Sequence, residues 1–274
     1  MRYKLAIFDL DGTVLDTLQD LANAVNRALD MHGYPQHSVE DVRVFVGNGV
    51  AKLIRRAVPA GTSDAECEAV LADFKASYRK HINDCTRPYA GIPEMLRALK
   101  DAGVKVGINS NKFDAAPQSL CRIHFDGLYD YAVGESEITP KKPDPTAAKR
   151  IMENMQVTPA ETIYIGDSDV DMQTGRNAGV DTAWVSWGFR KREEMTGCEV
   201  PIAFDSPEAL RDWYALKGFY MECPLNDMDR ITSPGLTNWL IGCYEALTPL
   251  YRFLMQLTPL AEMPEEMLPA PEGA

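Results

Sequence analysis

The chain has 274 residues, of which 45% are hydrophobic and 25% are charged, a composition typical of a globular protein with about two domains. Its formal net charge of −12 argues against a nucleic-acid-binding surface, so an anionic ligand has to be bound by a few local cations. The six cysteines are scattered without a C-x-x-C pair, which argues against a zinc site or a disulfide framework. Because Asp9 and Asp11 interrupt the first apolar run too early for a signal peptide, we expect a cytoplasmic protein.

The first predicted strand covers residues 5–8 and is followed by helical patterns. Apolar residues recur at helical spacing over residues 18–31, and helical stretches follow over residues 39–58, with a break at 47–49, and over residues 65–82. No strand pattern separates these stretches. We therefore expect an all-helical insert over residues 16–85.

From Pro88 onward, short apolar strands alternate with helices. The predicted helices cover residues 93–102, 115–123, 146–155 and 171–178, and the predicted strands cover residues 104–108, 131–133, 162–165 and 182–185. This alternation indicates βαβ units with right-handed crossovers and a mainly parallel sheet. We expect an α/β core formed by residues 1–15 and 86–215.

The sequence after residue 215 follows neither pattern. Residues 236–257 are apolar and aromatic and approach a membrane span in length, but Glu245, Arg252 and Pro249 oppose that interpretation. We expect a helix pair that packs on the core or on a second copy of the chain, which would make a homo-oligomer. Residues 263–274, rich in Pro and Glu, are expected to be disordered. Residues 216–274 are thus predicted to be a partly helical C-terminal extension.

Two aspartates follow the first predicted strand, in the run Asp9-Leu10-Asp11-Gly12-Thr13. If the alternation of the strand persists to its tip, Asp9 and Asp11 point the same way, and such a pair needs a shared proton or a cation. Gly12 allows a sharp turn, and Thr13 adds a hydroxyl beside the carboxylates. Taken alone, the run is equally consistent with an ordinary polar turn.

Three more polar clusters follow predicted strands, where open parallel sheets bind ligands. The run Asn109-Ser110-Asn111-Lys112 offers a hydroxyl, amides and a cation at the start of a helix. Lys141 and Lys142 precede prolines that stiffen the backbone, and residues 166–171 form an acidic loop suited to a hard divalent cation. Each cluster alone fits a helix cap or a solvated face, but chance explains their shared position poorly.

The order and identity of these residues resemble the haloacid dehalogenase-like superfamily, specifically its Mg²⁺-dependent phosphatases. The resemblance extends from Tyr3 to about Ala215 and includes all four motifs of the family: residues 9–13, Ser110, Lys142 in Lys-Pro-Asp-Pro, and residues 166–171. The helical insert resembles the cap of the phosphoglycolate phosphatase-like branch. The resemblance implies a three-layer Rossmann-like parallel sheet core with a small inserted α-helical cap domain over residues 16–85.

The resemblance also implies the chemistry of the site. Asp9 is expected to be the nucleophile that forms an aspartyl-phosphate, and Asp11 is expected to act first as a general acid and then as a general base. Mg²⁺ is expected to be held by Asp9, the carbonyl of Asp11 and Asp167, with Asp171 as a supporting acidic group. The metal would make an electronegative pocket accept phosphate.

The remaining implied residues bind substrate. Four polar residues are expected to contact its phosphate group: Thr13, Ser110, Asn111 and Lys142. Lys112 is expected to support these four residues without contacting the phosphate group itself. A glycine-rich run of the cap is a candidate substrate loop: Gly47, Asn48 and Gly49.

The implied function is Mg²⁺-dependent hydrolysis of a small phosphorylated metabolite, with phosphoglycolate as the first candidate and neither nucleic acid nor membrane as a partner. A phosphosugar mutase or a pyrophosphatase of the same superfamily stays open as an alternative. A dehalogenase is disfavoured because Asp11 and the following Gly12-Thr13 suit Mg²⁺-assisted phosphoryl transfer. A non-catalytic binding protein is disfavoured because a scaffold does not need all of these polar residues together.

Overall fold

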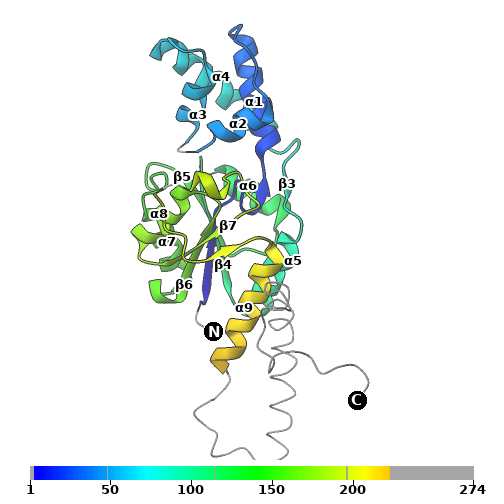
Figure 1. Ribbon diagram of the computed structural model, residues 1–274, viewed down its shortest axis with the longest axis vertical. Coiled ribbons are helices and arrows are strands. Elements are labelled where there is room, and N and C mark those ends of the chain that lie inside the picture. The colour runs from blue at the N-terminus through cyan, green and yellow to red at the C-terminus, as the bar shows by residue number, and fades with distance from the viewer. Residues whose placement is uncertain (1–2, 48, 114, 196, 223–274) are drawn as a thin grey trace, which may run out of the picture. The chain divides into compact units, whose positions relative to one another are not determined.

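The computed structural model describes residues 3–47, 49–113, 115–195 and 197–222 (Figure 1). The chain divides into two compact units, of which the first contains residues 2–215 and the second contains residues 216–274. Only the end of helix α9 (Pro207–Glu222) is described in the second unit. The predictions for residues 236–257 and 263–274 therefore lie outside the described residues. In the described part of the chain, no helix has the length and apolar character needed to span a membrane.

Among the described residues, six strands form a sheet at the centre of the first unit, in the order β5-β4-β1-β6-β7-β8 (Figure 1). Every neighbouring pair in this sheet is parallel. The strands are β1 (Leu5–Phe8), β4 (Lys105–Phe113), β5 (Tyr131–Glu135), β6 (Thr162–Gly166), β7 (Asp181–Val185) and β8 (Ala203–Phe204). The apolar run of β1 is buried throughout, as a strand covered on both faces requires.

Helices connect the strands of the sheet, as βαβ units require. They are α5 (Ile92–Asp101), α6 (Ala115–His124), α7 (Thr146–Met155) and α8 (Asp169–Ala178), with the short 3₁₀ helices η1 (Pro159–Glu161) and η2 (Arg192–Glu194). Leu5 and Ile7 of β1 pack in one buried cluster with Ile151 of α7 and Ala178 of α8. The predicted α/β fold with a parallel sheet is confirmed.

Strand β4 differs from its prediction. The sequence pattern ended this strand at Ile108 and read the polar run from Asn109 to Lys112 as the approach to the helix predicted from residue 115, whereas β4 continues to Phe113. The pairing of β4 with β5 shifts register after Asn109, so that Phe113 lies opposite Glu135. This irregular pairing takes up the extra residues and keeps the polar run in the sheet. The predicted strand end at Ile108 was therefore wrong, whereas the predicted helix start at Ala115 agrees with α6.

Four helices are described between the short strands β2 (Leu15–Asp16) and β3 (Arg87–Pro88). They are α1 (Leu18–Met31), α2 (Val39–Phe45), α3 (Val50–Ala57) and α4 (Asp64–His81). Ser38 and Ser63 begin α2 and α4 with capping boxes, which satisfy backbone N–H groups at the helix starts. We call α1 to α4 the helical insert.

The helical insert has a hydrophobic core of its own. Buried side chains from all four helices pack together there, among them Val25, Val42, Leu53 and Phe74. At its base, β2 and β3 pair antiparallel. The carboxylate of Asp20, in the first turn of α1, accepts hydrogen bonds from the backbone N–H groups of Cys85 and Thr86 at 2.8–3.0 Å. These hydrogen bonds and the β2–β3 pairing hold the segment that enters the helical insert against the segment that leaves it.

Candidate active site

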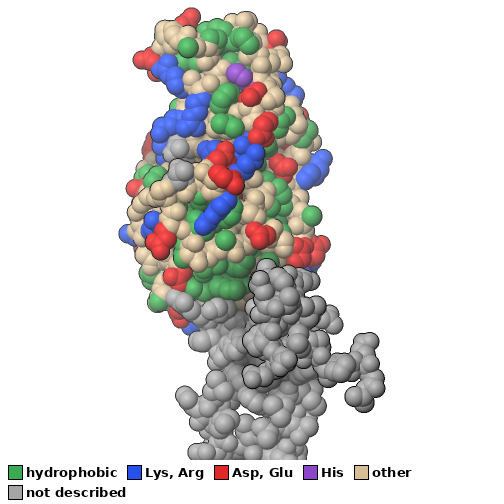
Figure 2. All heavy atoms as spheres, viewed as in Figure 1, with side chains coloured by type: hydrophobic (Ala, Val, Ile, Leu, Met, Phe, Trp, Pro, Cys, Tyr) green, Lys and Arg blue, Asp and Glu red, His purple; other side chains and the backbone are tan. Residues whose placement is uncertain are grey.

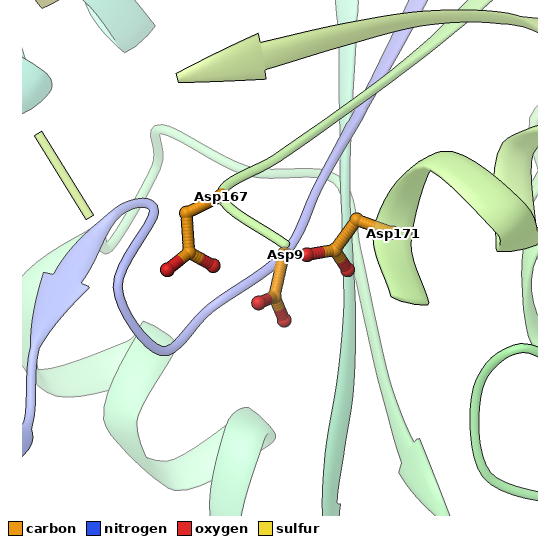
Figure 3. Close-up of side chains that lie close together, drawn as sticks. All are labelled: Asp9, Asp167 and Asp171. Atoms are coloured by element: carbon orange, nitrogen blue, oxygen red, sulfur yellow. The ribbon is translucent and has the colours of Figure 1, made fainter. Parts of the chain in front are cut away.

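Three buried carboxylates meet at the carboxyl edge of the sheet (Figure 3). Asp9 directly follows β1, Asp167 directly follows β6, and Asp171 lies in the first turn of α8. One oxygen of each carboxylate lies within 4.8 Å of those of the other two. Because β1 and β6 are parallel neighbours, their carboxyl ends bring Asp9 and Asp167 together. We call these residues the aspartate cluster.

Lys142 lies against the aspartate cluster with only 5% of its side chain exposed. Its Nζ donates to Oδ1 of Asp9 at 2.6 Å and to Oδ1 of Asp171 at 2.7 Å. Its backbone N–H donates to Oδ1 of Asn111 at 2.7 Å, which fixes the loop that carries the lysine. A buried cation held in this way can bind phosphoryl oxygens without a large rearrangement.

The charges of the aspartate cluster are not balanced, because three carboxylates face the single ammonium of Lys142. Burial and the charge of Asp171 raise the pKa of Asp9 well above its usual value, and the same two causes raise the pKa of Asp167 to about 7. Burial alone would lower the pKa of Lys142, but Asp171 and Asp9 raise it. The cluster therefore favours the uptake of protons or of a cation.

The residues present fit Mg²⁺. Carboxylate oxygens are the ligands that this hard cation prefers, and two added positive charges would offset the surplus of negative charge. The sequence interpretation expects Asp11 to contribute its carbonyl oxygen to the metal. Among the described residues, the carboxylate of Asp11 is not part of the aspartate cluster. Asp171, expected only as a supporting group, lies within that cluster.

The backbone around Asp167 leaves no room for additional side chains. Gly12 has φ of +81°, and a Cβ there would lie 2.5 Å from Oδ2 of Asp167. A Cβ at Gly188, which follows β7, would lie 2.2 Å from the Cβ of Asp167. The backbone N–H of Phe189 donates to Oδ2 of Asp167 at 2.6 Å. Two glycines and one backbone donor thus hold this carboxylate in place.

Asp11 lies beside the aspartate cluster and accepts hydrogen bonds from three side chains. The hydroxyl of Thr17 donates to Oδ1 at 2.5 Å, and Nζ of Lys112 lies 2.8 Å from the same atom. The hydroxyl of Ser110 donates to Oδ2 at 3.4 Å. Ser110 and Lys112 come from β4, so the unexpected length of this strand carries both side chains to Asp11.

A cavity of about 620 Å³ opens over these residues, between the sheet edge and the helical insert. Of the sequence-predicted residues, it is lined by Asp9, Asp11, Asn111, Lys112, Lys142, Asp167, Gly47 and Gly49. Asn48 lies outside the described residues. Thr13 and Ser110 are buried and do not line the cavity among the described residues, so their predicted contact with phosphate stays a prediction.

The sequence interpretation missed several residues that reach the cavity from other segments. Phe189 and Arg190 follow β7, and Tyr78 belongs to α4. The rule that ligands bind beyond the carboxyl ends of strands applies to β7 as well, and it could have drawn attention to Gly188 and the two residues after it. Tyr78 carries no such signal, because its place follows only from the packing of α4.

The model of the haloacid dehalogenase-like hydrolase family matches residues 6–185 of the chain, which include the aspartate cluster and Lys142. The chain therefore belongs to the haloacid dehalogenase-like hydrolases. The match agrees with the parallel sheet, the insert after β1 and the position of the aspartate cluster at the sheet edge.

Individual relatives narrow the class further. The chain is 34% identical over 213 residues to a phosphoglycolate phosphatase of Pseudomonas putida, covering 76% of this chain and 78% of the relative. It is 31% identical to an N-acetylmuramic acid 6-phosphate phosphatase of Pseudomonas aeruginosa, covering 77% and 95%. A crystal structure from Lactobacillus delbrueckii subsp. bulgaricus, provisionally named a phosphoglycolate phosphatase, superimposes with a TM-score of 0.74 at 33% identity, covering 78% and 98%.

These similarities confirm the predicted family and its phosphoglycolate phosphatase-like branch. Within the family, the chain is an enzyme of the phosphoric monoester hydrolase type. On the face drawn in Figure 2, Lys and Arg side chains are interspersed with Asp and Glu. Among the described residues that line the cavity, Lys112 and Lys142 are buried cations.

Proposed function

We propose that the chain is a Mg²⁺-dependent phosphatase of small phosphorylated carboxylic acids, with phosphoglycolate as the first candidate. The observation that carries the proposal is the buried contact between Asp9 and Lys142 at the inner end of the cavity, beside Asp167 and Asp171. A nucleophile, a phosphate-binding cation and a set of metal ligands meet there at one point, which is what phosphoryl transfer needs.

In the first step, a carboxylate oxygen of Asp9 attacks phosphorus and the bond between phosphorus and the leaving oxygen breaks. Asp11 donates a proton to that oxygen, so that the product leaves as an alcohol. Lys142 binds phosphoryl oxygens and compensates their negative charge. Asp9 then carries the phosphoryl group as an aspartyl-phosphate.

In the second step, Asp11 takes a proton from a water molecule, which attacks phosphorus and breaks the bond to Asp9. Phosphate is released, Asp9 is again a free carboxylate, and Asp11 again carries the proton that it donates in the first step. Bound Mg²⁺, held by Asp9, Asp167 and the carbonyl of Asp11 with Asp171 in support, would add positive charge where the phosphoryl oxygens gather. The surrounding insert excludes water from the first step.

The choice of a phosphorylated acid rests on the cavity and on the relatives. Besides the buried Lys112 and Lys142, further basic side chains line the cavity: Lys75, Arg79, Lys141 and Arg190. A second anionic group on the substrate can pair with one of them. The substrates in the names of the two relatives, phosphoglycolate and N-acetylmuramic acid 6-phosphate, both carry a carboxylate besides the phosphate.

Release of free phosphate from a panel of substrates tests the proposal. The panel contains phosphoglycolate, N-acetylmuramic acid 6-phosphate, glucose 6-phosphate and pyrophosphate, each with and without Mg²⁺. We expect Mg²⁺-dependent release with a higher kcat/KM for the two phosphorylated acids. An isomerised sugar phosphate without phosphate release would instead support a mutase, and preference for pyrophosphate would support a pyrophosphatase.

The proposal includes a cytoplasmic place of action and a homo-oligomer formed through residues 216–274. The support for the homo-oligomer is the apolar and aromatic sequence of residues 236–257. The support for the cytoplasmic place is the scatter of the six cysteines, which favours reduced thiols. A chain ending at Glu222 keeps α9 complete, and light scattering compares its mass with that of the full chain. An equal number of subunits in both would contradict the role in assembly.

A further inference from the structure

Lys112 is a buried cation that the mechanism above does not use. It lies on β4, two residues after Ser110, and only 6% of its side chain is exposed. Its Nζ lies 2.8 Å from Oδ1 of Asp11. A buried ammonium is costly unless it is paired and hydrogen-bonded, so a partner besides Asp11 is expected.

The second partner comes from the helical insert. The hydroxyl of Tyr78, on α4, accepts a hydrogen bond from Nζ of Lys112. Nζ also lies 4.6 Å from the centroid of the Tyr78 ring, within the range of a cation–π contact. The ring in turn stacks on Phe74, with centroids 5.4 Å apart, inside the core of the insert. The lysine is therefore held from the sheet side by Asp11 and from the insert side by Tyr78.

This arrangement makes the position of Asp11 depend on the helical insert. The lysine side chain has four rotatable bonds, and holding it in one rotamer costs conformational entropy. Tyr78, fixed by its packing, contributes to holding it, and the held lysine fixes Oδ1 of Asp11 together with Thr17. When α4 moves away from β4, Lys112 loses its hydrogen bond to the Tyr78 hydroxyl and its contact with the Tyr78 ring. Asp11 then loses a donor that is held in a fixed position.

We propose that Tyr78 and Lys112 are positioning residues, which orient the carboxylate of Asp11 for proton transfer only while α4 lies over the cavity. The proposal rests on the role of Asp11 in the proposed function. Proton transfer to the leaving group is thereby restricted to the state in which the insert covers the substrate. Displacement of a donor by about 1 Å can cost up to roughly 100-fold in rate, so such coupling is a sizeable effect.

Two substrates with different leaving groups test the proposal in the full-length protein. An alkyl phosphate such as phosphoglycolate needs a proton on its leaving oxygen, whereas p-nitrophenyl phosphate releases a stable anion and needs little help from a general acid. In Tyr78→Phe, which keeps the ring but lacks the hydroxyl, and in Lys112→Met, we expect kcat/KM to fall about 10- to 100-fold for phosphoglycolate. For p-nitrophenyl phosphate we expect a fall of less than roughly 3-fold, because kcat/KM reports the first step.

Three control measurements separate positioning from general structural damage. Tyr34→Phe changes a tyrosine of the same insert that does not line the cavity, and it should leave both substrates unaffected. Lys112→Arg, which keeps the charge, should recover part of the loss. Addition of Tyr78→Phe to Lys112→Met should cost nothing more, because the tyrosine acts through the lysine.

Equal losses for the two substrates in Tyr78→Phe would overturn the proposal, as would unchanged kinetics in that variant, which keeps its ring and is expected to fold. Additive losses in the double variant would overturn it as well. If the wild-type chain hydrolyses no substrate of the panel, the proposed function fails first and this inference fails with it. An active wild type with an unaffected Tyr78→Phe variant contradicts this inference alone.

Discussion

The sheet edge and the helical insert differ in what sets the positions of their charged side chains. At the sheet edge, Asp9, Asp167 and Lys142 are each at most 6% exposed, and short strands and tight turns set their positions. The insert has an apolar core in which Phe189 of the sheet unit also packs, and long side chains reach from it to the rest of the first unit, among them Arg43 of α2. Arg43 donates to the backbone oxygen of Phe189 and to both carboxylate oxygens of Glu194.

This difference assigns the two regions different tasks. Buried and crowded carboxylates cannot adapt to different substrates, so we expect the sheet edge to determine the reaction type. Contacts through long polar side chains form and break at modest cost, so we expect the insert to close over a substrate and to select its leaving group. The following predictions test this division, from the largest expected effect to the smallest.

Asp9→Asn should have the largest effect on activity. The amide cannot attack phosphorus, so kcat for phosphoglycolate should fall by about 10³-fold or more, as expected for loss of a nucleophile. Circular dichroism should show an unchanged fold, because Asn fills the same volume. A variant that keeps full Mg²⁺-dependent activity would contradict the role of Asp9.

Lys142→Met should damage both activity and stability. It leaves Asp9 and Asp171 buried without their cation, and removal of one partner from a buried ion pair costs about 3–5 kcal/mol. Lys141→Met is the matched control, because Lys141 is exposed and lies at the same cavity. Urea unfolding should show a change of less than about 0.5 kcal/mol for the control. Similar losses of stability in the two variants would contradict the distinction between the buried Lys142 and the exposed Lys141.

Mg²⁺ should stabilise the folded chain. Because the aspartate cluster exists only in the folded state, a concentration of 100 times Kd should raise the free energy of unfolding by about 2.7 kcal/mol. Thermal unfolding with Mg²⁺ or with EDTA measures the effect. In Asp167→Asn the increase should become much smaller, whereas Asp169→Asn, outside the cluster at the start of α8, should keep it. A similar increase in both variants would place the metal elsewhere.

Glu194→Gln should have the smallest effect, at the contact between the insert and the sheet unit. Hydrogen bonds from Arg43 lower the pKa of Glu194 from 4.5 to about 2. A lowered folded-state pKa means that the stabilisation is present above pH 4.5 and is lost as the pH falls toward 2. Since this pair is partly exposed, we expect the variant to lose only about 1 kcal/mol at pH 7.

The pH dependence provides the test of the Glu194 contact. The stability difference between wild type and Glu194→Gln in urea unfolding should shrink as the pH is lowered from 5 to 2. Glu193→Gln, at the exposed neighbouring position, should match the wild type throughout. A difference for Glu194→Gln that does not change with pH would mean that the carboxylate charge is not the cause.

Much of the fold and part of the site follow from the sequence. The apolar strand runs around Ile7 and Ile163 and the helical spacing of residues 146–155 predict a parallel sheet, because each pattern depends on local periodicity. The carboxyl ends of parallel strands share one edge, so the proximity of Asp9, Lys142 and Asp167 could be predicted too. Their assigned roles remain proposals.

The parts of the fold and of the site that the sequence did not predict depend on contacts between segments that are distant in the sequence. Periodicity could not show that β4 continues past Ile108, since the polar run there pairs irregularly with β5. The contact between Tyr78 and Lys112 joins residues 34 positions apart and follows only from the packing of α4. The backbone donor of Phe189 at Asp167 has no side-chain signature at all.

The antiparallel pairing of β2 and β3 has a consequence for how this chain can be engineered. Since Leu15 lies opposite Pro88, the chain leaves and rejoins the sheet unit at almost the same point. A segment with neighbouring ends can be exchanged for another without disturbing its host, as in domain insertion. We therefore expect that exchange of residues 16–85 with the insert of a relative transfers substrate preference and keeps the reaction type, provided that the new insert supplies side chains equivalent to Thr17 and Tyr78.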